Sequence, residues 1–188
     1  MAGAGFTLLE IVISLSIVAL LMGGSIAFLV INRAEARLRR TSGSVEGLAK
    51  RARTIAVLRQ TPYALEFHNG RVRLSPLVEA GIEDPEDLPQ LSADDDWPEE
   101  EGGADRPLAP VRDEIVFDEE MVVGVRRWGS DDWVVFDNER NRMTWRFDPN
   151  GLCEPISVRF EVDDGESWLE QQYHPLTASV RDYTMTSK

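Results

Sequence analysis

The chain has 188 residues and a formal net charge of -13, and its length leaves room for one ordinary globular domain beside a long helix. The first 60 residues hold eight basic and three acidic side chains, a balance of +5, which leaves -18 for residues 61–188. Nucleic acid is not expected as a partner, because its binding requires cationic groups that neutralise phosphates. Cys153 is the only cysteine; it excludes an intrachain disulfide, and we expect it to be a buried structural side chain.

The amino-terminal run Gly5-Phe6-Thr7-Leu8-Leu9-Glu10 is followed by residues 11–31 without an ionisable side chain. Twenty-one residues rise about 31 Å as a helix, close to the hydrocarbon thickness of a bilayer, so this stretch predicts a single transmembrane helix. A carboxylate beside such a stretch requires a cationic partner, which makes Glu10 a candidate functional residue. If the chain were cut between Gly5 and Phe6, the new amine would lie about one helical turn from Glu10, and the amine of a neighbouring chain could reach that carboxylate.

This junction resembles the type IV prepilin motif, which pilins share with the pseudopilins of type II secretion. The resemblance implies cleavage between Gly5 and Phe6 and methylation of the Phe6 amine by a prepilin peptidase. It further implies filament assembly through helix 6–31, with Glu10 paired to the amine of an adjacent subunit. Two other interpretations remain open: an ordinary secretory signal cut after Ala27, and a plain single-pass anchor in which Glu10 has no role.

After residue 31 the apolar positions favour an amphipathic helix over residues 32–60. Thr61-Pro62 should end it, because the residue before proline avoids the helical region. Arginines occupy the opposite face of this helix. The predicted buried stripe consists of Leu38, Val45, Leu48, Ala49, Ala52, Ile55 and Ala56.

The period then changes to two. Tyr63, Leu65 and Phe67 alternate with other side chains up to Asn69-Gly70, a dipeptide typical of a primed turn, so residues 63–74 predict a β-hairpin. Turn signals separate most of the later strand-like runs. These runs are 114–117, 121–128, 133–136, 143–147, 156–162, 167–173 and 178–183.

The order of a long helix, an early hairpin and the later turn Phe147-Asp148-Pro149-Asn150-Gly151 is similar to general secretion pathway protein H and its FimT-like relatives, which are minor pseudopilins. The resemblance implies an α+β fold, in which a long transmembrane helix with an amphipathic second half packs on an antiparallel β-sandwich-like domain. The expected parts are a leader 1–5, a transmembrane and filament half 6–31, an amphipathic half 32–60, and a periplasmic β-rich domain 61–188. The expected location is the inner membrane as a single-pass protein, and then the pseudopilus.

Residues 75–113 are expected to form an acidic loop. Within residues 79–120, seventeen side chains are acidic and two are basic, with five prolines; such stretches usually stay unfolded. The run 94–101 could instead hold calcium, although it lacks the spacing of an EF-hand loop.

Catalytic patterns are absent from the sequence, so we expect neither an enzyme nor a cofactor. His68 and His174 are the only histidines, and neither suggests a triad or a metal site. Trp128, Trp133 and Trp145 lie on strand-like segments and are expected to pack in the core or on a sheet face.

The sequence therefore predicts a minor pseudopilin of type II secretion. Its expected partners are other pseudopilin subunits, the prepilin peptidase, an inner-membrane assembly platform and membrane lipid. Two alternatives are a minor pilin of a type IV pilus, involved in pilus biogenesis or DNA uptake, and an unprocessed membrane-anchored binding domain.

Overall fold

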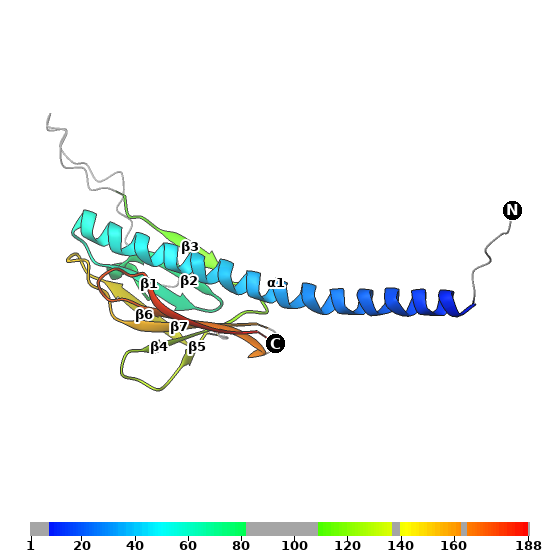
Figure 1. Ribbon diagram of the computed structural model, residues 1–188. Helices are drawn as coiled ribbons and strands as arrows, with labels where there is room; N and C mark the ends of the chain where they lie inside the picture. Colours follow the sequence, from blue (N-terminus) through cyan, green and yellow to red (C-terminus); the bar gives the residue numbers. More distant parts are fainter. Residues whose placement is uncertain (1–7, 82–108, 137–139, 163–164, 188) are drawn as a thin grey trace, which may run out of the picture.

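A computed structural model describes residues 8–81, 109–136, 140–162 and 165–187, and for residues 21–32 it describes the backbone alone. Helix α1 (Leu8–Arg59) dominates the molecule. Its carboxyl-terminal half packs on the strands, and its amino-terminal half extends well beyond them (Figure 1). We call the strands and the half of α1 that covers them the head.

The carboxyl-terminal half of α1 buries the stripe that its sequence predicts. Leu38, Val45 and Ala52 have no exposed surface, and Ile55 packs against the same core. The helix ends at Arg59, and the next residue, Gln60, has a φ of 51°. The predicted end before Thr61-Pro62 is therefore confirmed.

The first sheet contains the predicted hairpin. Strand β1 (Tyr63–His68) pairs with β2 (Arg71–Pro76) so that His68 lies opposite Arg71, across the turn Asn69-Gly70. A short 3-10 helix, η1 (Leu77–Glu79), follows β2. The sheet order is β3-β2-β1-β6, and its outer strands are β3 (Asp113–Val116) and β6 (Arg142–Phe147).

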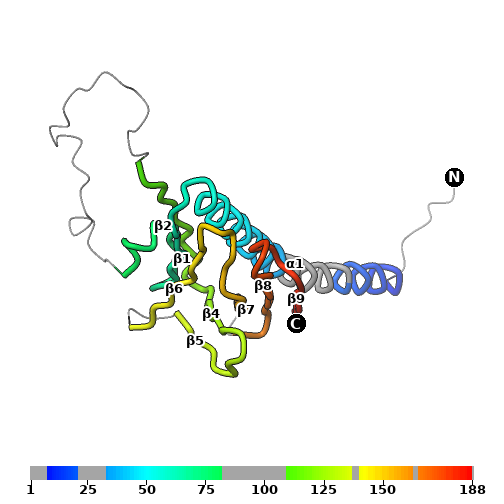
Figure 2. The backbone as a smooth tube through the Cα atoms, turned by 90° about the vertical axis from the view of Figure 1, so that its left-hand side faces the viewer, coloured from blue at the N-terminus to red at the C-terminus, as the bar shows by residue number. Residues whose placement is uncertain are grey.

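The second sheet is also antiparallel and has the order β5-β4-β7-β8-β9. Figure 2 shows β1, β2 and β6 on one side of the head and β8 and β9 on the other. The strands of the second sheet are β4 (Val122–Arg127), β5 (Val134–Val135), β7 (Ile156–Val162), β8 (Ser167–Tyr173) and β9 (Val180–Thr186).

One hydrophobic core joins both sheets to α1. Trp145 is fully buried, and its ring centroid lies 4.7 Å from that of Phe147 and 4.9 Å from that of Tyr173. The indole N–H of Trp145 donates to the carbonyl of Glu154 at 2.7 Å. The largest core side chain therefore has both its apolar surface and its polar atom accommodated.

The expected transmembrane helix is contradicted. Within the described residues, no helix combines the length and the apolar character needed to cross a membrane. The prediction of an α+β fold whose helix spans a membrane with residues 6–31 is therefore wrong. The same finding contradicts the expected single-pass, inner-membrane location with a periplasmic domain.

Two side chains of the head also differ from expectation. Glu66 alternates with apolar residues, yet it is only 3% exposed, because Arg73 and Arg142 lie 2.8 and 3.0 Å from its carboxylate. Trp128 was expected to pack in the core or on a sheet face but is 74% exposed. It follows the last residue of β4, where the alternation of the strand no longer applies.

Candidate assembly surface

The amino-terminal part of α1 whose side chains are described is apolar over most of its circumference. Every residue from Leu8 to Leu20, which we call the arm, is exposed. A helix with apolar side chains on all sides is normally covered by protein or lipid. Its large apolar side chains, each at least half exposed, are Leu8, Leu9, Ile11, Val12, Ile13, Leu15, Ile17, Val18 and Leu20.

Covering the arm would release a large free energy. Burying a leucine, isoleucine or valine side chain stabilises by about 1.5–3 kcal/mol, so nine such side chains contribute more than about 10 kcal/mol when fully covered. Association costs about 4–15 kcal/mol in lost translational and rotational freedom. The arm is therefore a surface with enough apolar area to drive assembly.

Glu10 lies in the first turn of α1 and is exposed. A carboxylate is favoured there because the backbone N–H groups of a helix amino terminus carry partial positive charge. Glu10 is also the acidic side chain within the arm, which otherwise holds apolar residues and two serines. Gly5 and Phe6 lie outside the described residues, so the pairing of Glu10 with a Phe6 amine stays a prediction.

Ion pairs join α1 to the strands and turns of the head at two places along the helix. Arg37 lies 3.2 Å from Asp118 and 3.0 Å from Glu120, on the turn before β4. The hydrogen bond to Glu120 is the largest of the effects that raise the pKa of Arg37. Arg51 pairs with Asp113 at the beginning of β3. Arg37 and Arg51 of α1 thus pair with acidic side chains in the turn before β4 and at the beginning of β3.

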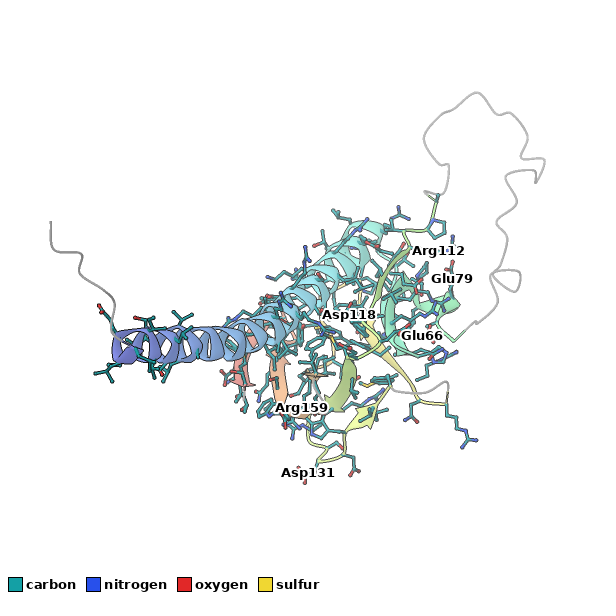
Figure 3. The ribbon with its side chains drawn as sticks, turned by 90° about the vertical axis from the view of Figure 1, so that its right-hand side faces the viewer. Glu66, Glu79, Arg112, Asp118, Asp131 and Arg159 are labelled. Atoms are coloured by element: carbon teal, nitrogen blue, oxygen red, sulfur yellow. The ribbon has the colours of Figure 1, made fainter. Side chains whose placement is uncertain are left out.

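A ladder of arginine and tryptophan side chains crosses the second sheet, and the sequence did not predict it. The guanidinium of Arg159 lies 5.5 Å from the ring of Trp133 and 4.2 Å from that of Trp168, and Arg126 lies 4.7 Å from Trp133. Figure 3 places Arg159 on this sheet, away from the labelled residues of the first sheet. Alternation along β7 and β8 places Arg159 and Trp168 on one face, but their contact depends on strand pairing.

Strong candidates for catalysis do not emerge among the residues that the structure describes. No group of three His, Cys, Asp or Glu side chains there could hold a metal ion. Cys153 is buried as expected, and burial raises the pKa of its thiol to about 11. His174 accepts a hydrogen bond from the backbone of Leu176 at 3.2 Å. The calcium alternative at 94–101 lies outside the described residues.

Comparison with known proteins found no match among protein-family models, curated proteins or solved structures.

Proposed function

We propose that the chain is a minor pseudopilin, a structural subunit of a type II secretion filament that assembles through the arm. The exposed arm carries this proposal. Its mostly apolar circumference requires cover along its length, and contacts with the helices of neighbouring subunits would supply it.

Two features of the sequence add support. The Gly5-Phe6 junction resembles a prepilin cleavage site, and a cut there would create an amine shortly before the arm. Glu10 supplies the carboxylate to which the amine of an adjacent subunit would pair. A charge pair between otherwise apolar helices would favour one stagger over others, because only that stagger brings the carboxylate to the amine.

The first experiment tests processing. The chain is produced with and without a prepilin peptidase, and its intact mass is measured. We expect the peptidase to remove residues 1–5 and the mass of one methyl group to be added at Phe6. A chain that keeps residues 1–5 in the presence of active peptidase would contradict the proposal.

The second experiment tests assembly. Two differently tagged copies of the processed chain are produced together, and their co-purification is measured for the wild type, for Glu10→Gln and for the control Glu35→Gln. Glu35 lies on the same helix but outside the arm, where it pairs with Arg39 at 2.8 Å. We expect Glu10→Gln to reduce co-purification about tenfold and Glu35→Gln to leave it unchanged. Equal co-purification by all three would refute the role of Glu10, and its absence in the processed wild type would favour an unassembled binding domain.

A further inference from the structure

Trp128 stands at the edge of a hollow in the head. It is 74% exposed, and its backbone N–H donates to the carbonyl of Pro155 at 3.1 Å. The hollow has a volume of about 140 Å³ and is lined mainly by Trp128, Pro155, Ile156, Tyr173, Pro175 and Arg181. We call it the Trp128 hollow. An exposed tryptophan beside two prolines is a surface on which an extended peptide can pack.

The apolar surface continues past the hollow. The backbone N–H of Cys153 donates to the carbonyl of Pro175 at 2.9 Å, so the backbone segments that carry Leu152 and Leu176 meet at this bond. Leu152 is 42% exposed and Leu176 is 54% exposed. Exposed apolar side chains gathered beside a hollow favour an interaction surface.

The charged side chain among the residues that line the hollow is a cation, on a domain whose balance is -18. Arg181 lines the hollow and is exposed, and Arg127 directly precedes Trp128. Arg127 lies 3.4 Å from Glu154, a pair in which its side chain stays 54% exposed. The hollow therefore suits a peptide that combines proline with acidic side chains, since proline-rich segments bind aromatic-lined grooves and guanidinium groups bind carboxylates.

The chain itself contains a segment of this chemistry. Residues 82–108, which lie outside the described part, include eleven acidic side chains, one basic side chain and four prolines. Half of these 27 residues could extend at most about 45 Å. That length is sufficient to reach a neighbouring molecule.

Contacts on the head hold both ends of this segment. Arg142 donates to the carbonyl of Gly81 at 2.7 Å, and Arg59 donates to the carbonyl of Ala109 at 2.6 Å. Arg112 makes two hydrogen bonds of 2.8 Å to Glu79, a pair visible in Figure 3. Glu79 precedes the segment and Arg112 follows it. Their pairing fixes where on the head the segment begins and ends.

We propose that the Trp128 hollow of one copy binds the acidic segment 82–108 of a second copy. Proline side chains of the segment pack on Trp128, and its carboxylates pair with Arg181. This contact joins two heads and does not use the arm, so it is independent of the assembly surface proposed above.

The test uses the full chain with a photoreactive benzoylphenylalanine in place of Trp128. Unlabelled photoreactive chain is mixed with isotope-labelled wild-type chain in a mild detergent that covers the arm, and adducts are mapped by mass spectrometry after irradiation. We expect adducts between the photoreactive position and residues 82–108 of the labelled chain. The same photoreactive group at Leu58, which is 77% exposed on the last turns of α1, is expected to give none.

Three results would overturn the proposal. Adducts to the segment of the same chain alone would place the contact within one copy, and adducts elsewhere would assign the hollow to another partner. The third result concerns two charge-reversal variants. Arg181→Glu is expected to reduce adducts between chains at least about fivefold. The control Arg146→Glu makes an equal change of charge at a side chain that is 58% exposed, and it is expected to leave the adducts unchanged. Equal yields from the two variants would show that the hollow does not recognise the segment. Because detergent covers the arm, failure here leaves the proposed filament function intact.

Discussion

Gly151 offers a sharp test of how the head is held on α1. It lies in the turn that follows β6, with a φ of 83°, and its carbonyl accepts a hydrogen bond of 2.9 Å from Arg53 of α1. A Cβ added there would lie 3.1 Å from the Nη2 atom of Arg53 and 3.3 Å from the Cγ2 atom of Val57. Alanine at this position would therefore encounter both an unfavourable backbone conformation and a contact with the helix.

The magnitude follows from these two effects. A left-handed conformation costs a residue with a Cβ about 1–2 kcal/mol, and overpacking costs about 1–3 kcal/mol. We therefore expect Gly151→Ala to lower the free energy of unfolding by about 2–5 kcal/mol.

Two other glycines separate these contributions. Gly70 has a φ of 69° with no atom within 4 Å of an added Cβ, so Gly70→Ala is expected to cost only the backbone part, about 1–2 kcal/mol. Gly43 lies within α1 and is equally open, so Gly43→Ala is expected to stabilise by up to about 1 kcal/mol.

Urea unfolding followed by tryptophan fluorescence, in a mild detergent that covers the arm, measures all three free energies. If Gly151→Ala cost no more than Gly70→Ala, the contact between this turn and α1 would not constrain the fold. If Gly43→Ala were destabilising, this would contradict the finding that an added Cβ has open space at that helix position.

Three further changes follow from buried groups. The pKa of Cys153 is raised to about 11 in the folded state. Its contribution to stability is therefore present below the unfolded pKa and is lost as pH rises towards 11. Between about pH 9 and 11, Cys153→Ala should lose less unfolding free energy than the wild type does. A thiol reagent at pH 8 should modify native Cys153 at least about tenfold more slowly than urea-unfolded chain, and equal rates would contradict its burial. Glu66→Gln should destabilise by about 2 kcal/mol in urea unfolding, because Arg73 and Arg142 lose their carboxylate, whereas an unchanged midpoint would show that the cluster contributes nothing.

Local chemistry was sufficient to predict much of the secondary structure. Asn69-Gly70 predicted the hairpin because few other residues tolerate the positive φ values of a primed turn, 42° and 69° here. Pro62 predicted the end of α1, and the spacing of Leu38, Val45 and Ala52 predicted the face that α1 buries. These features depend on residues that are close in sequence, so the sequence contains them almost completely.

Tertiary structure alone decided which distant residues meet. Strand β6 pairs with β1 although β2 to β5 lie between them in sequence, and this pairing brings Arg142 to Glu66. Alternation had placed Glu66 with polar residues, and it could not reveal that two arginines would accompany its burial. Periodicity also could not show that Trp128 is exposed beside a hollow, since its position depends on a loop that contacts Pro155.

The amino-terminal region shows the same division. Composition by itself established that the arm is apolar and that Glu10 is the acidic residue within it, because both are properties of consecutive residues. Length and hydropathy also led to a transmembrane prediction for 6–31, which the described helix contradicts. The change of apolar pattern after residue 31 predicted which half of α1 is covered. Only the tertiary structure showed which strands cover it, because that contact depends on how distant segments of the chain pair.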